Sequence, residues 1–381
     1  MTILTVNAGS SSIRLAVFVK NGNGISKLAD RKYTIEGEPS SVLELFIQEH
    51  NVKDIHIIAH RIVHGGTRFT GSCFINNAVE AEIDKLSSLA PLHNPHALKW
   101  IRTCSKMFGD AVPQAAVFDT SFYADLPEVA AFYALPKDLC RQYGIRRYGF
   151  HGIAHIAMLK RWKKLKPDLK DGGNVISLQL GAGCSVTAVR HGRAVDTSMG
   201  FSTLEGLVMA TRSGDIDPEI IFHLEHSAGI SLAEIQKMLN HSSGLLGISG
   251  ISSDMRVLLQ DSCPDARFAV ELFCCRARKY IGAYMSVLGG ADAFLFGGGI
   301  GENSPHVREK ILNGMEWMGV ILDMSSNSAT IGEEACISAE NSNTAVWVIP
   351  VDEASVIAEE AVSVLEKKQL FYGGCNAKYS F

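Results

Sequence analysis

The segment from Asp196 to Pro218, DTSMGFSTLEGLVMATRSGDIDP, concentrates residues that can bind and stabilise charge. Arg212 stands between two hydroxyl residues and is followed by Asp215 and Asp217. A guanidinium that short turns hold in place can present its planar fork to a carboxylate or a phosphate. The alternative is a surface loop whose charges pair with one another. The segment alone leaves both interpretations open.

Two more charged residues end apolar runs. Arg61 lies near the C-terminal end of the run IHIIAHRIV, which leads into His64 and a glycine pair. From this position it can reach the cleft of an open α/β sheet. Pairing at the sheet edge is the alternative for this arginine. Asp119 follows a second apolar run and precedes Thr120 and Ser121. A carboxylate at a strand end beside a phosphate is a usual magnesium ligand, directly or through water.

A histidine pair follows the segment RRYGF. His151 and His155 are four residues apart and face the same side if a helix begins near Gly152. This spacing also suits a metal ion, but the other ligands of a zinc site are not evident. A single histidine is more often structural, and the functional alternative is that His151 donates a hydrogen bond into a cleft.

Two predicted hairpins place small residues where a ligand can approach the backbone. In the first, residues 3–6 and 13–19 flank a turn of serine and glycine, and in the second, residues 175–180 and 185–189 flank Gly181-Ala182-Gly183. Hydroxyl and backbone N–H groups at such turns suit phosphate oxygens, although a lone turn of this kind is more often only a turn. Their recurrence half a chain apart indicates a duplicated α/β unit with a ligand gripped between two halves.

Two other segments are expected around these hairpins. A buried strand at 293–296 leads into the glycine-rich sequence GGGIGEN, which we interpret as a loop that lets the backbone approach a nucleotide. Residues 264–288 form the longest predicted helix. An apolar stripe that belongs to the core or to a subunit interface comprises Phe268, Leu272, Cys275, Ile281 and Leu288.

The composition is that of a soluble globular protein. The 381 residues are 46% hydrophobic and 20% charged, with a net charge of −4, which gives no indication of a nucleic-acid or membrane partner. The N-terminus lacks a basic region followed by an apolar one, and no apolar run approaches the length of a bilayer span, so a cytoplasmic protein is expected. Nine cysteines without a CxxC pair fit reduced thiols. A chain of this length is expected to form two domains.

Taken together, the motifs resemble the acetate kinase family, within the acetate and sugar kinase, Hsp70 and actin superfamily. The resemblance spans nearly the whole chain. The motifs that carry it are, in order, NAGSSS, HRIVHGG, APLHNPHAL, VFDTSF, RRYGFHGIAH, DTSMGFSTLEGLVMATRSGDIDP, SSDMR and GGGIGENS. It implies an α/β fold of two duplicated actin-like ATPase-type domains, ribonuclease H-like, that flank a central cleft. The first domain would comprise residues 1–118 plus 354–381, completed by the C-terminal helix, and the second, with the nucleotide site, residues 119–353.

The resemblance also implies roles for individual residues. Arg61 and Arg212 would hold the acyl carboxylate and the transferring phosphoryl group, His151 would stabilise that group, and His93 would assist. The magnesium ion, with manganese as an alternative, would be held by Asp119, Glu353 and Asn7. The phosphate side and the two hairpins would use Asn7, Ser10, Ser12, Arg14, Gln179, Gly181, Ala182 and Gly183. The adenosine pocket would comprise Asp254, Arg256, Gly299, Ile300, Gly301 and Asn303, and the acyl pocket Val63, Leu92, Phe150 and Thr203.

Four positions depart from the family pattern. Arg14 stands where the family usually has Lys, so a compact ammonium is exchanged for a broad fork. Gln179 and Ala182 replace a His and an Asn of the second hairpin; the glutamine can still donate a hydrogen bond, whereas the alanine side chain donates nothing. Thr203 stands where Pro is common at the acyl pocket. The hairpin departures bear on the phosphoryl donor, and Thr203 bears on the identity of the carboxylate.

The expected activity is reversible, direct in-line phosphoryl transfer between ATP and a short-chain carboxylate, giving acyl phosphate and ADP. Phosphoryl transfer asks the protein mainly for positioning and charge stabilisation, and two arginines, a histidine and a carboxylate-bound metal ion meet that demand. The alternatives are a pyrophosphate-dependent or propionate- or butyrate-type acyl kinase, and a non-catalytic nucleotide-binding paralogue. A homodimer is the expected assembly of the family.

Overall fold

The computed structural model describes residues 1–373 except 10, 11, 23, 35, 36 and 92, with side chains up to residue 367. The chain divides into two compact units. The first comprises residues 1–124 and the segment from Asp352 onward, and the second comprises Asp125–Val351. The sequence placed these boundaries at 118/119 and 353/354; with the boundaries found here, Asp119 and Glu353 both belong to the first unit.

The first unit is built on a six-stranded mixed sheet of order β3-β2-β1-β4-β6-β5. Its strands are β1 (Thr2–Ala8), β2 (Ser12–Asn21), β3 (Gly24–Thr34), β4 (Ile55–Ile62), β5 (Cys73–Phe74) and β6 (Gln114–Phe118). Its helices are α1 (Pro39–Glu49), α2 (Asn77–Lys85), α3 (Asn94–Phe108) and α15 (Glu353–Gly373), with 3-10 turns η1 (Leu86–Ser88) and η2 (Asp119–Tyr123). The predicted hairpin is present as the antiparallel pair β1 and β2.

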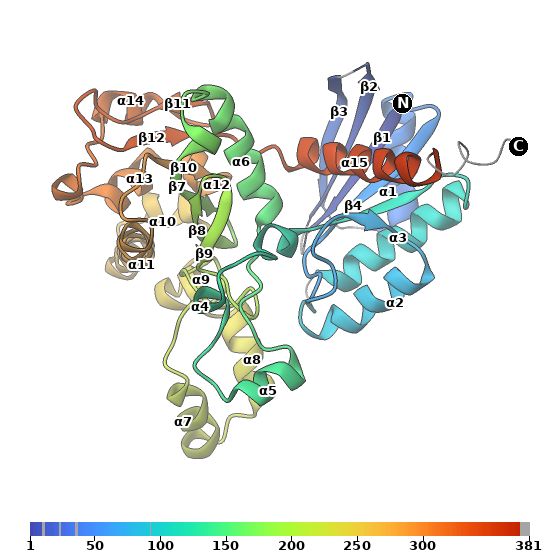
Figure 1. Cartoon of the computed structure of the whole chain (residues 1–381). Coiled ribbons are helices and arrows are strands. Elements are labelled where there is room, and N and C mark those ends of the chain that lie inside the picture. The colour runs from blue at the N-terminus through green and yellow to red at the C-terminus, as the bar shows by residue number, and fades with distance from the viewer. Residues whose placement is uncertain (10–11, 23, 35–36, 92, 374–381) are drawn as a thin grey trace, which may run out of the picture. The chain divides into compact units, whose positions relative to one another are not determined.

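Side-chain alternation decides which residues of this sheet can form a site. Leu4, Val6 and Ala8 of β1 pack into a core with residues of α1 and α3. Because successive side chains of a strand point to opposite faces, Asn7 lies on the other face, as does Arg61 of β4. Helix α15 packs on β1, β4 and β6, and Figure 1 shows it lying along this sheet. The carboxyl ends of these three parallel strands therefore bring polar side chains to the beginning of α15.

The second unit repeats the same sheet topology. Its order, read in the matching direction, is β9-β8-β7-β10-β12-β11. In both sheets a three-stranded antiparallel meander continues into two further parallel strands and ends in a two-residue antiparallel strand. The strands are β7 (Asn174–Leu180), β8 (Cys184–Arg190), β9 (Arg193–Thr197), β10 (Ala293–Gly297), β11 (Ala335–Cys336) and β12 (Ala345–Val348). The duplication inferred from the two hairpins is thus present in the folded chain.

Helices of the second unit cover its sheet and extend beyond it. They are α4 (Glu128–Ala131), α5 (Lys137–Tyr143), α6 (Gly152–Leu165), α7 (Glu219–Ala228), α8 (Leu232–His241), α9 (Gly244–Ser249), α10 (Met255–Gln260), α11 (Pro264–Leu288), α12 (Gly298–Asn303), α13 (Pro305–Leu312) and α14 (Met324–Ala329), with 3-10 turns η3 (Lys170–Gly172) and η4 (Glu316–Met318). Helix α6 packs on β7, and α11 packs on β7, β8 and α9. Among the described residues no helix has both the length and the apolar character needed to cross a membrane.

Two expectations about helices were wrong in detail. The glycine-rich GGGIGEN is not a loop, because its last six residues form the short helix α12 directly after β10. On α11 the predicted stripe is buried only in part: Ile281 and Leu288 are buried, whereas Phe268 is 57% exposed and Cys275 is exposed. Ala266, Ala269 and Ala277, which were not predicted, are fully buried. Small residues let α11 approach α9 and the sheet closely, and hydrophobicity alone favoured the larger side chains.

Candidate active site

Four polar side chains of the first unit form what we call the acidic cluster: Asn7, Arg61, Asp119 and Glu353. Nε of Arg61 lies 3.2 and 3.1 Å from the two carboxylate oxygens of Asp119, and Nη2 lies 2.7 Å from Oδ2. Nη1 of Arg61 donates to Oδ1 of Asn7 at 3.1 Å and lies 3.8 Å from Oε2 of Glu353. Nδ2 of Asn7 completes the cluster by donating to Glu353 at 2.6 Å.

The acidic cluster holds one guanidinium against two carboxylates. Burial alone would lower the pKa of Arg61, but the charges of Asp119 and Glu353 outweigh it and raise that pKa above its ordinary value. Asp119 has no exposed surface, so the charge of its carboxylate is balanced by the guanidinium of Arg61 rather than by water. The cluster therefore has an arginine that is fixed in place and a net charge of −1.

Arg14, the departure at the first hairpin, turns to another partner. Its Nε and Nη2 donate to the carboxylate of Asp30 on β3 at 2.6 and 2.8 Å. Asp30 also accepts from Lys27, which is 2.9 Å from Asp352. The side chain of Arg14 remains 45% exposed, so this pair differs from the buried pair of Arg61.

A second group, which we call the cationic cluster, lies in the second unit and comprises His151, Gly183 and Arg212. A methyl group added at Gly183 would lie 3.4 Å from Nε2 of His151 and 3.5 Å from Nη2 of Arg212, so both side chains converge on the tip of the hairpin β7–β8. His151 precedes α6 with a left-handed backbone, φ 57° and ψ 23°. Histidine is one of the few residue types that adopt this conformation with some frequency.

The setting of Arg212 is the opposite of that of Arg61. Its Nη1 donates to the carbonyl of Thr203 at 2.8 Å, and no carboxylate of the second unit forms an ion pair with it within the described residues. Burial lowers its pKa from the ordinary value, and the thiol of the neighbouring Cys184 provides only a weak opposing effect. A desolvated guanidinium without a counter-charge favours an incoming anion.

The irregular segment around Arg212 is held by acidic residues whose role the sequence did not indicate. It runs from residue 198 to 218, between β9 and α7, without a helix or strand, whereas Asp196 and Thr197 are the last two residues of β9. Asp215 accepts from Tyr280 at 2.7 Å and from the backbone N–H of Gly206 at 2.7 Å. Asp217 instead accepts from the N–H of Glu219 at the start of α7. The alternative that these aspartates neutralise Arg212 is therefore wrong.

Glu205 provides a second anchor for the same segment. It accepts from Tyr133 and, at 2.8 Å, from Nη2 of Arg147, whose Nη1 binds the carbonyl of Thr197 at 3.1 Å. The hydroxyl of Tyr133 also accepts from the N–H of Phe201 at 2.7 Å. In the sequence, the only sign that Glu205 and Asp215 anchor this segment is that they flank Arg212. Their partners Tyr133 and Tyr280 lie far away in sequence.

The remaining predicted residues of the second hairpin and the glycine-rich segment lie close together. Gly181 approaches the N–H of Gly299, and a methyl group at Gly298, whose φ is +77°, would lie 2.6 Å from the carbonyl of Leu180 and 2.9 Å from Nε2 of Gln179. The carbonyl of Ala182 accepts from Ala210 of the irregular segment at 3.0 Å. The other residues predicted here, Gly183, Ile300, Gly301 and Asn303, belong to the hairpin tip or to α12.

Arg308 on α13 fixes the end of α12. It is fully buried, and it donates to the carbonyls of Gly301, Glu302 and Thr330 and to both the side chain and the backbone carbonyl of Asn327. Burial lowers its pKa to about 10. The glycine-rich backbone is thus positioned by a neighbouring helix as well as by the strand that precedes it.

Asp254 and Arg256 lie at the start of α10. Asp254 accepts from the N–H of Arg256 at 2.9 Å, as a helix cap, and pairs with its guanidinium at 2.6 Å. The Arg256 side chain is 87% exposed. A pocket between α10, α11 and α13 is lined by Leu258, Leu259, Asp261, Arg267, Val270, Glu271, His306 and Lys310, and it includes neither predicted residue.

The predicted acyl-pocket residues are divided between the two units. Val63 belongs to the first unit, whereas Phe150 and Thr203 belong to the second; Val63 and Phe150 are almost fully buried. His93 precedes α3 in the first unit. Ser10 and Leu92 lie outside the described residues, and Ser12 begins β2.

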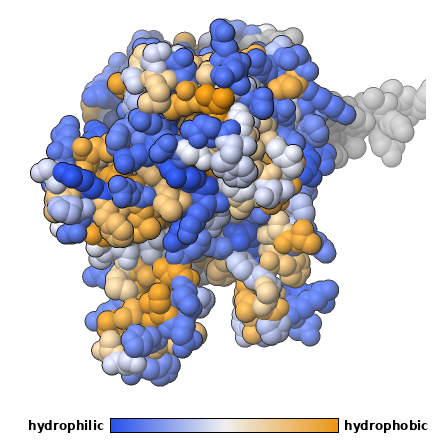
Figure 2. All heavy atoms as spheres, turned by 90° about the vertical axis from the view of Figure 1, so that its left-hand side faces the viewer, coloured by the Kyte–Doolittle hydropathy of each residue, from blue (hydrophilic) through white to orange (hydrophobic). Residues whose placement is uncertain are grey.

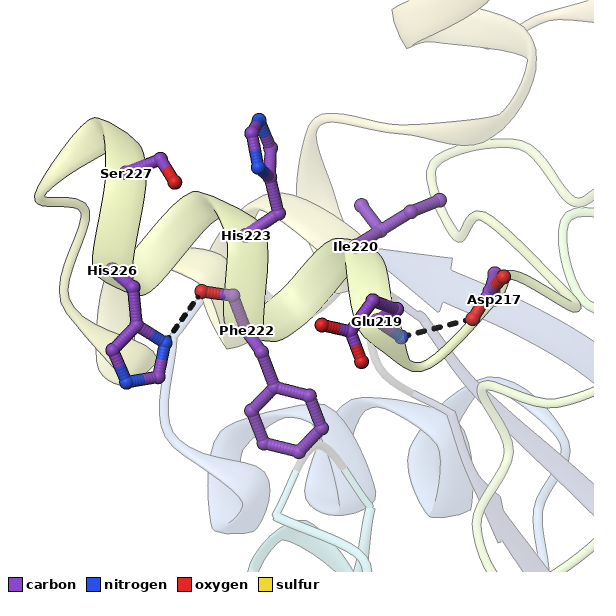
Figure 3. Close-up of a pocket in the computed structure, with 7 residues that line it drawn as sticks. All are labelled: Asp217, Glu219, Ile220, Phe222, His223, His226 and Ser227. Atoms are coloured by element: carbon purple, nitrogen blue, oxygen red, sulfur yellow. Dashed lines mark hydrogen bonds between the residues drawn. The ribbon is translucent and has the colours of Figure 1, made fainter.

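Another pocket of the second unit includes none of the predicted acyl-pocket residues. It runs along α7 and is lined by Asp217, Glu219, Ile220, Phe222, His223, His226 and Ser227. Figure 3 shows that its two histidines point away from each other, and Nδ1 of His226 bonds the carbonyl of Phe222 at 2.8 Å. The face of the molecule in Figure 2 carries apolar side chains scattered among hydrophilic ones.

The acidic cluster has the donor chemistry of a hard metal ion. Carboxylate and amide oxygens are the ligands that Mg²⁺ prefers, and Mg²⁺ in phosphoryl-transfer sites uses one or two carboxylates together with water and substrate phosphates. Among the described residues no group of three or more His, Cys, Asp or Glu forms a closed metal cage. The acidic cluster supplies two carboxylates and one amide oxygen, so a metal ion held there would need water or substrate oxygens as further ligands.

A chain of two α/β units with the same mixed-sheet topology has the fold of a phosphotransferase of the actin-like ATPase type. Comparisons identify the family. Residues 25–359 match the model of the acetokinase family, and the chain belongs to this family.

Relatives and solved structures agree with this assignment. The chain is 46% identical over 324 residues to acetate kinase of Chloroherpeton thalassium, covering 84% of this chain and 78% of the relative. It is 43% identical over 397 residues to acetate kinase of Shewanella oneidensis, covering 96% and 99%. It is similar to the structure of a propionate kinase from Francisella tularensis, with a TM-score of 0.87, 37% identity and coverage of 95% and 99%. It also resembles Porphyromonas gingivalis acetate kinase, with a TM-score of 0.86, 34% identity and coverage of 96% and 99%.

Proposed function

We propose that this protein transfers the terminal phosphoryl group of ATP to a short-chain carboxylate, reversibly and in one in-line step. The acyl phosphate and ADP are the products, and the reverse reaction makes ATP. The observation that carries the proposal is the contrast between two arginines: Arg61 is fixed by carboxylates, whereas Arg212 lies desolvated beside His151 without a carboxylate partner in its unit.

In the proposed reaction, Arg212 and His151 bind the equatorial oxygens of the transferring phosphoryl group, where charge is spread in the transition state. Arg61 orients the carboxylate that attacks. His93 assists near the acyl group. Since these residues belong to both units, the proposal requires the two clusters to act on one phosphoryl group.

The acidic cluster is proposed to hold the divalent metal ion that accompanies the nucleotide, with Mg²⁺ expected and Mn²⁺ as a substitute. Asp119, Glu353 and Asn7 would provide oxygens to it, directly or through water. When bound, the ion neutralises phosphate charge. The net charge of −1 on the cluster makes the approach of a cation favourable.

The nucleotide is proposed to lie against the hairpin β7–β8 and α12. Gly181, Ala182, Gly183 and Gly299 would offer backbone to phosphates, while Ile300, Gly301, Asn303, Asp254 and Arg256 would surround the adenosine. Ser10, Ser12 and Arg14 are proposed to serve the phosphate side of the first unit. A homodimer in the cytoplasm is the proposed assembly and location.

The identity of both substrates is tested by one panel. Purified protein is incubated with acetyl, propionyl and butyryl phosphate, each with either ADP or inorganic phosphate, and the formation of ATP or pyrophosphate is measured. We expect ATP from at least one acyl phosphate and none of the pyrophosphate reaction. Pyrophosphate formation alone would contradict ATP as the donor, and binding of ADP without any transfer would favour a non-catalytic paralogue.

Ala182 and Thr203 allow the panel to be sharpened. If ATP is the donor, Ala182→Asn restores a side-chain hydrogen-bond donor at the hairpin tip and should lower the KM for ATP, with little change in the KM for the carboxylate. A lower KM for pyrophosphate instead would favour the other donor.

A further inference from the structure

Glu302, the fifth residue of α12, accepts two backbone hydrogen bonds through one carboxylate oxygen. Its Oε1 accepts from the N–H of Gly298, the first residue of the same helix, at 2.8 Å. It also accepts from the N–H of Val351, which follows strand β12, at 3.0 Å. The side chain of Glu302 thus joins the start of α12 to a segment from another part of the second unit.

The bond from Gly298 is a helix cap. The first N–H groups of a helix have no partner within it, and the N-cap residue Gly297 has no side chain that could accept from them. A helix of six residues is also too short to be stable by itself, so it depends on such contacts. Capping explains this hydrogen bond but not the one from Val351, which lies outside the helix.

The backbone of Glu302 is held in place by other contacts. Its carbonyl accepts from Nη1 of Arg308 at 3.1 Å and from the N–H of Gly332 at 3.0 Å. Arg308 is fully buried on α13. Because the backbone that carries the carboxylate is fixed, the hydrogen bond between Glu302 and Val351 restrains Val351.

The end of β10 lies close against the same segment. The N–H of Ile349 donates to the carbonyl of Phe296 at 2.9 Å. A methyl group added at Gly297 would lie 2.7 Å from Cγ2 of Val351, so this approach requires glycine. Pro350 has no N–H. The N–H of Val351 is therefore the last backbone donor before the chain leaves the second unit.

The residues directly after Val351 lead into the acidic cluster. Asp352 caps α15 by accepting from the N–H and the hydroxyl of Ser355 at 3.2 and 2.6 Å. Glu353 comes next and belongs to the acidic cluster. Two residues of fully extended chain span at most about 7 Å. The backbone of Glu353 therefore begins within a short length of chain from the N–H that Glu302 binds.

We propose that Glu302 is a positioning residue that holds Val351 and thereby restrains the backbone leading into Glu353. Both donors are neutral N–H groups, so the reach of the side chain matters more than its charge. The consequence for turnover rests on the proposed function, in which Glu353 binds the metal ion. If Val351 were free, Glu353 would have to be ordered when the ion binds, which lowers affinity.

Amide hydrogen exchange of Val351 tests the restraint directly, by NMR of the full-length protein labelled with ¹⁵N-valine. Val351→Ile identifies the resonance and keeps the N–H. We expect a protected amide in the wild type and exchange about tenfold faster in Glu302→Asp, which corresponds to the loss of one hydrogen bond. Exchange in the wild type at the rate of an unstructured peptide, or equal rates in the two proteins, would overturn the proposal.

Two substitutions separate reach from charge. Glu302→Gln keeps an oxygen at the same distance from the backbone and removes the charge, whereas Glu302→Asp keeps the charge and is shorter by one methylene. Glu302→Gln should keep the protection of Val351 and most of kcat, while Glu302→Asp should lower kcat by about tenfold or more. The opposite order would show that Glu302 acts through its charge and would contradict positioning.

Metal binding provides a second measurement. With ADP present, the affinity for Mn²⁺ measured by titration should fall in Glu302→Asp and stay near the wild-type value in Glu302→Gln. Fast exchange of Val351 in Glu302→Asp together with unchanged Mn²⁺ affinity and kcat would overturn the role in the reaction.

The matched control is Glu334→Asp, which shortens another glutamate of the second unit. Glu334 also accepts two hydrogen bonds, from Nε and Nη2 of Arg161 at 2.5 and 2.7 Å, and it lies outside the proposed site. It should change neither the exchange of Val351 nor kcat. If the protein transfers phosphate to no carboxylate, only the proposed function fails, because the exchange rates of Val351 still decide whether Glu302 holds this segment.

Discussion

The two units share one sheet topology but carry different chemistry at equivalent strand ends. In the first unit, the ends of β4 and β6 carry Arg61 and Asp119, whose side chains meet in a buried ion pair. In the second unit, the corresponding strand β10 ends at Gly297, and β12 is followed by Ile349 and Pro350, none of which is charged. The charge is provided by Arg212 of the irregular segment instead. The duplicated fold thus provides equivalent strand ends in both units. The residues at those ends determine whether the charge of an arginine is balanced by carboxylates, as for Arg61, or is not, as for Arg212.

The two arginines show what that difference means. Arg61 keeps its charge because Asp119 and Glu353 raise its pKa, and it is fixed by their geometry. Burial removes water from the guanidinium of Arg212 and lowers its pKa. Its hydrogen-bond partners are the carbonyl of Thr203 and the sulfur of Met209. We infer that the first arginine orients and the second binds the charge that develops during transfer.

The largest effect is expected at Arg212. Arg212→Ala should lower turnover by about 10²–10³-fold, since one donor to developing charge is lost, while circular dichroism and thermal unfolding stay near wild type. Arg278→Ala is a suitable control, because Arg278 also donates to carbonyls, those of Lys310 and Ile311, outside the proposed site. Near-normal turnover in Arg212→Ala would contradict the distinction between the two arginines.

Asp119→Asn tests Arg61, the arginine whose charge is balanced by carboxylates. Breaking a buried ion pair leaves Arg61 with only one carboxylate, so the free energy of unfolding should fall by about 3 kcal/mol. Turnover and the affinity for Mn²⁺, measured by titration, should fall as well.

The matched control is Asp30→Asn, which breaks a bidentate pair with Arg14 in the same unit. Since Arg14 is 45% exposed, the expected loss of stability is at most about 1 kcal/mol. Equal losses in the two variants would show that burial does not distinguish the two pairs.

How much of this was predictable differs between the units. The sequence indicated Arg61 and Asp119 because each ends an apolar strand, and parallel strands bring such ends together. The order of the motifs indicated the family, and the repeated hairpins indicated the duplication, which the two sheets confirm. The assignment of roles to individual residues remains a prediction.

The second unit was harder to predict. Asp215 and Glu205 were visible only as charges near Arg212, and their partners Tyr280 and Tyr133 lie 65 and 72 residues away in sequence. The spacing of His151 and His155 indicated a shared helix face. Ser185, whose hydroxyl lies between the two rings, comes from strand β8 and could not be identified from spacing. Long-range polar contacts of this kind follow from tertiary packing rather than from local pattern.

Each unit contains a buried histidine, so the two units can also be compared by how the free energy of unfolding depends on acid pH. Burial lowers the pKa of His60 in the first unit to about 4 and that of His155 in the second to about 3. Above pH 6.5 both are neutral in the folded and the unfolded chain, so stability is full there. Below pH 6.5 only the unfolded chain takes up the protons, and the free energy of unfolding should fall by about 1.4 kcal/mol per pH unit for each histidine.

Denaturant unfolding between pH 7 and pH 5 measures this slope. The double variant His60→Leu with Gln114→Leu removes both partners of a buried hydrogen bond of 2.6 Å and should flatten the slope by the share of one histidine. His241→Gln, which changes an exposed histidine, should leave it unchanged. A slope that does not respond to the double variant would contradict the buried, neutral state of His60.

The smallest effect is expected at Thr203. Thr203→Pro keeps the carbonyl that accepts from Arg212 and changes only the side chain, so the ratio of kcat/KM values for propionate and acetate should shift by about tenfold or less. Complete loss of activity would instead assign Thr203 a role in holding Arg212.

The most direct test of the account is a double-mutant cycle between Arg61 and Arg212, measured as kcat/KM for the carboxylate at saturating nucleotide. Because both arginines are inferred to act on one phosphoryl transfer, the account predicts strong non-additivity, with Arg61→Ala/Arg212→Ala losing little more than the worse single variant. Losses that simply multiply would show that the two units do not act on the same reacting group, and would contradict the account.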